Sequence, residues 1–268
     1  MDNRAIGIFD SGLGGLTCVK KVMEIMPGED IIYFGDTGRV PYGTRSPETL
    51  VKYVKQDINF LESFNIKLII IACGTASSAA LPRIKDEIKT EIIGVLDPAC
   101  KAAAEATRNG KIGVIGTQGT INSGKYTQTL KGINQELEIF STACPLFVPL
   151  VENGYTSGEI VDLVAHDYLD NIKKEGVDTL ILGCTHYPLL ALEIQRIMGD
   201  GVKLINSGAE TAVEAKRYLE SCDMLSGRDK GCAKYYVSDC AEGFSELGSI
   251  FLEKRIEGSV EKIDIEKY

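Results

Sequence analysis

Short apolar runs rich in β-branched residues alternate with helical stretches along almost the whole chain. The runs are RAIGIFD, DIIYFGD, KLIIIAC, EIIGVLD, KIGVIG, EIFSTAC, TLILGC, VKLINS and AKYYVSD. Their hydrophobicity is continuous rather than alternating, which is typical of strands that are buried on both faces. Because helical stretches separate them, the pattern predicts an α/β fold built on doubly wound parallel sheets.

Two halves of the chain carry similar motifs in the same order. IGIFDSG begins at Ile6 and IGVIGTQG begins at Ile112, while Cys73 and Cys184 each end a later apolar run. The spacing between the two motifs is nearly equal in the two halves, which predicts two domains of like topology. The alternative is that unrelated βα units have converged on similar strings.

The same motifs suggest where the domains divide. We expect the first domain to span residues 1–97 and the second to span residues 98–206, with the chain crossing back just before Ser207. Residues 207–268 would then complete the first domain with two helices and the strand AKYYVSD.

Capping residues mark the expected helix starts, because a short polar side chain can accept a hydrogen bond from the first backbone N–H groups of a helix. The expected caps are Ser46 before Pro47, Asp97 before Pro98, Thr156 with Glu159, and Ser207 with Glu210.

Composition narrows the classes of protein. The 268 residues carry a net charge of -9, which argues against a nucleic-acid surface, because such a surface needs clustered Lys and Arg. No apolar run approaches the length of about 20 residues that spans a bilayer, and the N-terminus lacks the regions of a signal peptide. We expect a cytoplasmic enzyme with free thiols, because the eight cysteines include no C-x-x-C pair.

Ligands of open α/β sheets bind beyond the carboxyl ends of the strands, so candidate residues are those that end a strand and begin a helix. Small and hydroxylic residues at these points let backbone N–H groups and hydroxyls approach an anion closely. The rule selects Asp10, Ser11, Asp36 to Gly43, Cys73 to Ser77, Thr117 to Thr120, Cys184 to His186, and Ser207.

The two strand-end cysteines are the strongest candidates for chemistry. Either one alone could be a small buried hydrophobic residue. Together, on opposite faces of a substrate carbon, one thiolate could remove a proton while the other thiol returns one, which inverts the centre. A neighbouring group must then activate each thiol: Asp10 or Asp36 beside Cys73, and His186 or Glu152 beside Cys184.

The sequence does not support three common types of cofactor or metal site. GTINSGKY resembles a phosphate-binding loop, but Tyr126 stands where Ser or Thr would contact Mg²⁺. DSGLGG lacks the G-x-G-x-x-G frame of a dinucleotide site, and two histidines without paired spacing do not suit zinc. We therefore expect neither a cofactor nor a metal ion.

The motifs DSGLGGLT, YFGDTGRVPYG, ACGTASS, IGVIGTQGT, PLVENG and LGCTHYPLL together resemble the glutamate racemases, which interconvert L- and D-glutamate without a cofactor and supply D-glutamate for peptidoglycan, the cell wall that maintains cell shape. The resemblance extends from about Ile6 to the C-terminal SDCAEGFSELGSIFL. It implies two α/β domains with the active site between them, and a homodimer whose interface it does not define.

The resemblance also implies roles for individual residues. Cys73 would act on the D-face and Cys184 on the L-face, assisted by Asp10 and His186, with Asp36 and Glu152 as second candidates. Substrate contacts are expected from Asp10, Ser11, Tyr42, Gly43, Gly74, Thr75, Thr117, Thr120, Thr185 and His186.

One residue departs from the usual family motif, which is A-C-N-T with an Asn that contacts the substrate. This chain has Gly74 at that position. Either a water or a neighbouring group fills the gap and glutamate remains the substrate, or the pocket takes another amino acid such as aspartate. Restoring Asn should tighten glutamate binding if the missing amide sets affinity. Two further alternatives are a non-catalytic carboxylate-binding protein and a cysteine hydrolase built on Cys184 and His186.

Overall fold

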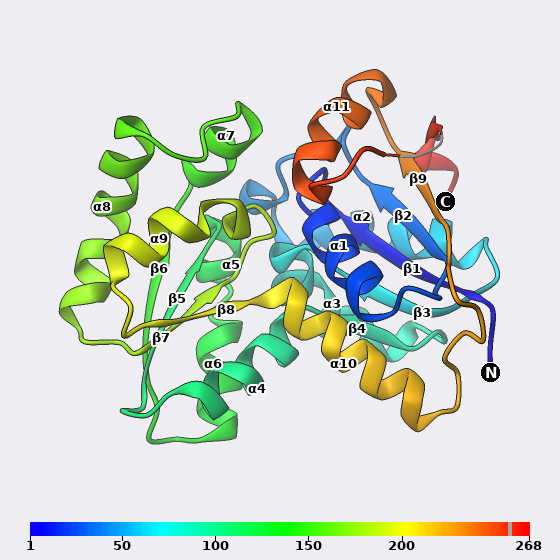
Figure 1. The fold of residues 1–268 in the computed structure, drawn as a ribbon. Coiled ribbons are helices and arrows are strands. Elements are labelled where there is room, and N and C mark those ends of the chain that lie inside the picture. Colours follow the sequence, from blue (N-terminus) through cyan, green and yellow to red (C-terminus); the bar gives the residue numbers. More distant parts are fainter. Residues whose placement is uncertain (257–258) are drawn as a thin grey trace.

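The computed structural model describes residues 1–256 and 259–268. This part of the chain forms two parallel β-sheets with helices on both faces (Figure 1), as the sequence predicted. The six-stranded sheet has the order β10-β9-β2-β1-β3-β4, and the four-stranded sheet has the order β6-β5-β7-β8. We call the layers around them the first and the second domain.

The strands of the first sheet are β1 (Ala5–Asp10), β2 (Ile31–Gly35), β3 (Ile66–Ile71), β4 (Ile92–Gly94), β9 (Ala233–Val237) and β10 (Val260–Lys262). Neighbouring side chains on these strands point to opposite faces. Ile6 and Ile8 pack in one apolar cluster, whereas Phe9 packs in another on the far side of the sheet. Both faces are therefore buried, which explains the continuous hydrophobicity of the strands.

Among the described residues, the following helices and short helical segments flank the first sheet, together with η2 (Ala76–Ala80). They are α1 (Leu16–Ile25), α2 (Pro47–Glu62), α3 (Leu81–Ile84), α10 (Ser207–Ser221) and α11 (Ala241–Leu252), with the short helices η1 (Tyr42–Thr44), η3 (Lys85–Glu87) and η5 (Ile265–Lys267). Helices α1, α10 and α11 contribute to the apolar cluster on the face of Ile6, and α2 contributes to the cluster on the face of Phe9.

The second sheet consists of β5 (Lys111–Gly116), β6 (Glu138–Ala143), β7 (Thr179–Leu182) and β8 (Lys203–Asn206). One face packs against α4 (Leu96–Ala106) and α6 (Lys125–Ile133), and the other packs against α8 (Glu159–Lys174) and α9 (Ala191–Met198). The remaining segments are α5 (Gln118–Asn122), α7 (Phe147–Glu152) and η4 (Tyr187–Leu190).

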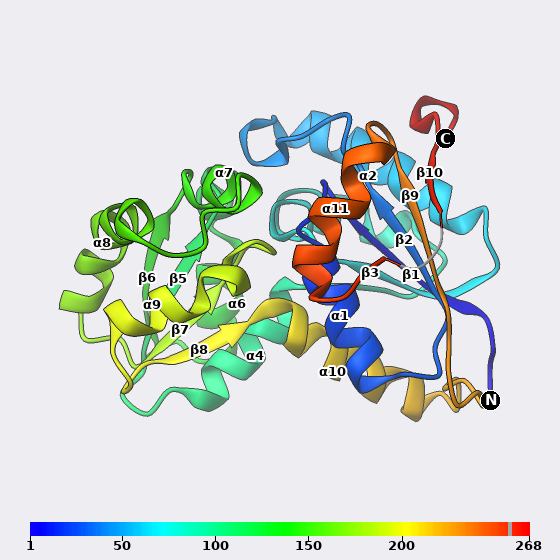
Figure 2. The same cartoon turned by 45° about the horizontal axis from the view of Figure 1, so that its top comes forward.

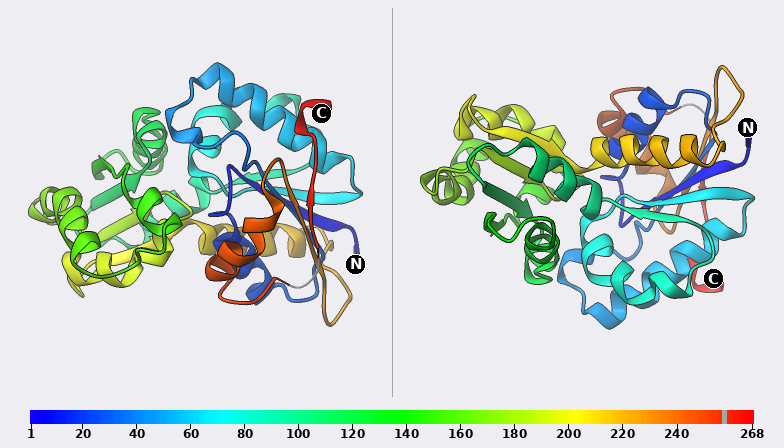
Figure 3. Two further views of the ribbon diagram at one scale, coloured as in Figure 1. Left: turned by 90° about the horizontal axis from the view of Figure 1, so that it is seen from above. Right: turned by 90° about the horizontal axis from the view of Figure 1, so that it is seen from below.

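The two sheets share a topology. The order β2-β1-β3-β4 in the first sheet matches β6-β5-β7-β8 in the second, which confirms the predicted likeness of the two halves. Strands β9 and β10 extend only the first sheet, and both termini lie on the first domain (Figure 3). The sequence pattern predicted β9 but missed β10, which spans three residues.

Three of the four expected helix caps are wrong. Ser46 does cap α2, since its side chain accepts a hydrogen bond from the backbone of Thr49. Helix α4 begins before Asp97, and α8 begins after Gly158, which has a φ of 97°. The cap of α10 is Asn206 rather than Ser207, because the Ser207 hydroxyl instead donates to the Leu182 carbonyl at 2.8 Å.

Candidate active site

Cys73 lies two residues beyond the end of β3, where the chain turns into the π-helix η2. Its Sγ accepts a hydrogen bond from the backbone N–H of Ala76 at 3.5 Å, and its thiol donates to Ser11 Oγ at 3.7 Å. Burial raises the pKa of the Cys73 thiol to about 12, and the nearby charge of Asp10 adds to this effect. Cys73 is therefore a protonated thiol at neutral pH.

Asp10, the last residue of β1, has a carboxyl group whose two oxygens differ in their hydrogen bonding. Its Oδ2 accepts a hydrogen bond from the backbone N–H of Gly12 at 3.0 Å. Among the described residues, its buried Oδ1 has no hydrogen-bond partner. Burial raises the pKa of Asp10, although the charge of His186 opposes this. A buried acceptor without a partner is costly, so Asp10 is well placed to receive a donor from a bound ligand.

Cys184 lies two residues beyond the end of β7, in the position that matches Cys73. Its Sγ is 3.8 Å from His186 Nδ1, which confirms the proximity predicted from the sequence. His186 has helical φ and ψ of -81° and -28° as the cap of η4, so a turn rather than extended chain brings the two side chains together.

Glu152, at the end of α7, completes the group around Cys184. Its Oε1 is 3.0 Å from His186 Nε2. Burial by itself lowers the pKa of His186, but the hydrogen bonds to Cys184 and Glu152 outweigh it and raise that pKa to about 10. The imidazole is therefore protonated at neutral pH.

Three threonine hydroxyls join the two domains. Thr75 Oγ1, from the first domain, lies 2.9 Å from Thr117 Oγ1 and 3.3 Å from Thr120 Oγ1, both from the second. The latter two hydroxyls are 3.0 Å apart. Gly43 also reaches this region, because a Cβ atom built on it would lie 3.0 Å from Thr117 Cβ. The structure thus brings together four residues that the sequence selected from separate loops.

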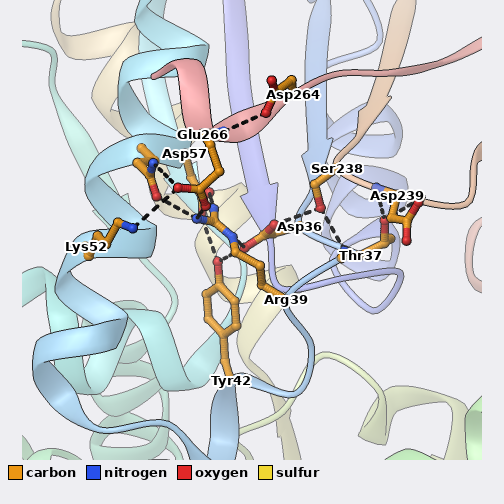
Figure 4. A network of polar contacts seen from close by, with 12 residues as sticks. Asp36, Thr37, Arg39, Tyr42, Lys52, Asp57, Ser238, Asp239, Asp264 and Glu266 are labelled. Carbon is orange, nitrogen blue, oxygen red and sulfur yellow. Dashed lines mark hydrogen bonds and ion pairs between the residues drawn. The ribbon is translucent and has the colours of Figure 1, made fainter.

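Asp36 and Tyr42 lie in a separate polar network (Figure 4). The carboxylate of Asp36 accepts hydrogen bonds from Arg39, Tyr42 and Ser238. The Tyr42 hydroxyl is also 2.9 Å from Asp57. Both oxygens of Asp36 are therefore engaged, in contrast to those of Asp10, and the phenol ring of Tyr42 is held by the network.

Two contacts that the sequence did not indicate cross between the domains to the loop of Cys184. The hydroxyl of Thr17 in α1 donates to the backbone carbonyl of Thr185 at 3.0 Å. The ring of Phe251 in α11 meets the ring of His186 edge-on, with centroids 5.3 Å apart. Helix α11 lies beside α1 (Figure 2), so the C-terminal segment reaches the candidate site. Both residues lie in motifs that carried the resemblance, but only the fold shows their partners.

The described residues contain no group of three or more His, Cys, Asp or Glu side chains that could hold a metal ion. The same part of the chain contains no helix long and apolar enough to cross a membrane. The site consists of one thiol near a carboxyl group, one thiol beside an imidazolium, and three threonine hydroxyls where the two domains meet. This arrangement can hold a small carboxylate and move protons on two opposite sides of it.

Comparison with known proteins agrees with this chemistry. Residues 14–215 match the family model of Asp/Glu/hydantoin racemases. A glutamate racemase from Geobacter metallireducens is 46% identical over 98% of this chain and 97% of its own. The structure of a glutamate racemase from Bacillus anthracis is 36% identical, with a TM-score of 0.95 over 98% of both chains.

A further solved structure is that of a glutamate racemase from Francisella tularensis in complex with D-glutamate, which is 38% identical, with a TM-score of 0.93 over 100% of both chains. These similarities extend over both sheets. The chain belongs to the Asp/Glu/hydantoin racemase family.

Proposed function

We propose that this protein is a glutamate racemase that interconverts L- and D-glutamate without a cofactor and supplies D-glutamate for peptidoglycan. The observation that carries the proposal is the placement of Cys73 and Cys184 at matching strand ends of two sheets whose carboxyl edges meet. The names of the relatives support glutamate as the substrate.

The reaction needs one base and one acid. In the L-to-D direction, the Cys184 thiolate takes the α-proton of L-glutamate, and the electron pair stays on the α-carbon. The Cys73 thiol then gives its proton to the opposite face, which yields D-glutamate and leaves Cys73 as the thiolate. The reverse reaction uses the same groups in exchanged roles.

The neighbours of each thiol support these roles. His186, held by Glu152, stabilises negative charge on Cys184. Asp10 lies close enough to Cys73 to raise the pKa of its thiol, which keeps a proton available there. General acid–base assistance of this kind contributes about 10²- to 10⁴-fold in rate. Fixed donors around the carboxylate must supply the rest of the stabilisation.

The substrate would lie between the two thiols. We assign its α-ammonium to the free Oδ1 of Asp10, because a buried carboxylate oxygen without a partner suits a cationic donor. The hydroxyls of Thr75, Thr117 and Thr120 suit a carboxylate. Ser11, Gly43, Gly74, Thr185 and the backbone of Tyr42 would complete the contacts, with Asp36 as the second candidate for a helper of Cys73.

The proposal also covers the organisation of the protein. We place residues 1–97 and 207–268 in the first domain and residues 98–206 in the second, which the distribution of strands between the two sheets supports. We further propose a cytoplasmic homodimer, in line with the resemblance to the family. Light scattering of the purified protein tests the dimer, and a monomer at working concentrations would refute it.

The test of function is racemisation of purified protein with separate L- and D-enantiomers of glutamate and aspartate, followed by chiral chromatography. We expect glutamate to be converted in both directions without added cofactor. Conversion of aspartate alone would identify aspartate as the substrate. This alternative is tested because Gly74 stands where the usual family motif has Asn. Binding of glutamate without conversion would indicate a carboxylate-binding protein instead.

A further inference from the structure

Gly74, which follows Cys73, lies directly against the second domain. A Cβ atom built on it would overlap the backbone carbonyl oxygen of Gly183, the residue before Cys184. Gly74 is not among the glycines with positive φ, so its backbone conformation does not require glycine. Glycine is required at position 74 because the space between the two domains is too small for a side chain there.

The carbonyl that faces Gly74 is held in place. The backbone N–H of Gly183 donates to the Ile115 carbonyl at 2.8 Å. The preceding strand, β7, is an inner strand paired with β5 on one side and β8 on the other. No side-chain rotation can relieve an overlap with a backbone atom fixed in this way. A side chain at position 74 would therefore have to push the two domains apart.

The two domains are closed onto each other in this structure. The cavity beside Gly74 and Cys184, lined from both domains, measures about 10 Å³. A cavity of about this size holds a single water molecule, so the segments around Gly74 are closely packed. The Thr75–Thr117 and Thr17–Thr185 contacts span the same interface.

We propose that Gly74 allows the two domains to approach each other closely at the Gly183 carbonyl, and that any side chain at position 74 holds the cleft between the domains open. The closed form keeps both thiols away from water, since Cys73 and Cys184 are only 5% and 8% exposed. It also competes with substrate, because apparent affinity falls with the fraction of molecules that are competent to bind. The competition with substrate rests on the proposed function, whereas the closure of the two domains does not.

Thiol alkylation of the free protein tests the closure. Gly74→Ala is compared with the wild type and with Gly132→Ala, a control position where a Cβ atom meets nothing within 4 Å. Iodoacetamide labelling of Cys73 and Cys184 is measured by peptide mass spectrometry, with the exposed Cys222 as internal reference. Circular dichroism confirms that each variant is folded.

We expect Gly74→Ala to label both site thiols at least about fivefold faster than the wild type, because an unrelieved steric overlap shifts an equilibrium by that factor or more. Gly132→Ala should label at the wild-type rate. Equal rates in folded Gly74→Ala and wild type would overturn the proposal. Thr17→Val, which removes another contact across the interface, should increase labelling in the same direction if the alanine variant does not fold.

Titration calorimetry with an equilibrated mixture of D- and L-glutamate measures affinity. It distinguishes an effect of domain closure on affinity from an effect of the missing Asn side chain. If closure limits affinity, Gly74→Ala and Gly74→Asn should both bind more tightly than the wild type. If only Gly74→Asn binds glutamate more tightly, the missing amide sets the affinity, and the claim that closure limits affinity is overturned. Absence of glutamate binding in every form, including the wild type, would refute the proposed function and leave the alkylation result intact.

Discussion

Cys73 and Cys184 occupy matching positions in the two sheets, yet their surroundings are different. Cys73 lies near the buried carboxyl group of Asp10, and the pKa of its thiol is raised to about 12. Cys184 contacts His186, whose pKa is raised to about 10 by hydrogen bonds to Cys184 and Glu152 that outweigh its burial. The repeated topology thus sets the positions of the thiols, while their local partners differ.

Under the proposed mechanism, this difference would supply an acid and a base at the same pH. The carboxyl group on one side and the imidazolium on the other separate the two roles. The predictions below test whether the two sides differ in this way.

Loss of either thiol should have the largest effect. Cys73→Ala and Cys184→Ala should each lose racemisation by at least about 10²- to 10⁴-fold, because each removes the acid or the base on one face. In D₂O, each variant should retain slow α-hydrogen exchange with one enantiomer only, monitored by proton NMR. Wild-type racemisation by either variant would show that the two thiols do not act as a pair.

The variants Asp10→Asn and Asp36→Asn should show which carboxyl group assists Cys73 and which one only stabilises the fold. We expect Asp10→Asn to lower kcat/KM by about 10²- to 10⁴-fold. Asp36→Asn weakens the charged hydrogen bonds to Arg39 and should lower the free energy of unfolding by about 1.5–3 kcal/mol. Urea denaturation and initial rates measure both effects. A larger activity loss in Asp36→Asn at unchanged stability would make Asp36 the helper.

The pH dependence tests the Cys184 side. Because His186 carries its proton up to about pH 10, kcat/KM should fall as pH rises through that value. Glu152→Gln removes one of the hydrogen bonds that raise the pKa of His186, so the alkaline limb should move to lower pH. The exposed Glu159→Gln on the next helix is the control. An unchanged profile in Glu152→Gln would exclude Glu152 as the partner of His186.

Phe251 should have the smallest effect, and on the Cys184 side alone. Phe251→Leu removes the edge contact with His186, and such aromatic contacts are worth about 0.5–1.5 kcal/mol, which corresponds to roughly two- to tenfold in kcat/KM. Ile250→Leu on the same helix, at a position that is 46% exposed, is the control. If both variants match the wild type, α11 does not position the imidazole.

Most of the fold follows from the sequence because strands buried on both faces leave a continuous apolar signal. Nine strands were predictable from their apolar runs, although β6 and β8 are only partly buried. Strand β10 was not predictable, because its residues Val260–Lys262 are mostly polar and lie at an edge of the sheet. Helix caps were less predictable. Ser207 had the right side chain to cap α10, but its hydroxyl found a carbonyl on another strand.

The candidate site was predictable where it consists of strand ends. Cys73, Cys184 and His186 follow from position in the chain. Contacts between domains do not, since nothing local to Thr17 or Phe251 indicates a partner in the second domain. Gly74 is intermediate: the sequence shows that a side chain is missing, and only the structure shows the Gly183 carbonyl that occupies its place.

The most direct test of the central claim is to follow the deuterium content of both enantiomers during the first turnovers of L-glutamate in D₂O. Two facing thiols predict that newly formed D-glutamate carries deuterium delivered by Cys73, while recovered L-glutamate remains almost free of it. Deuterium that enters recovered L-glutamate as fast as D-glutamate forms would mean that one group serves both faces, and would contradict the two-thiol account.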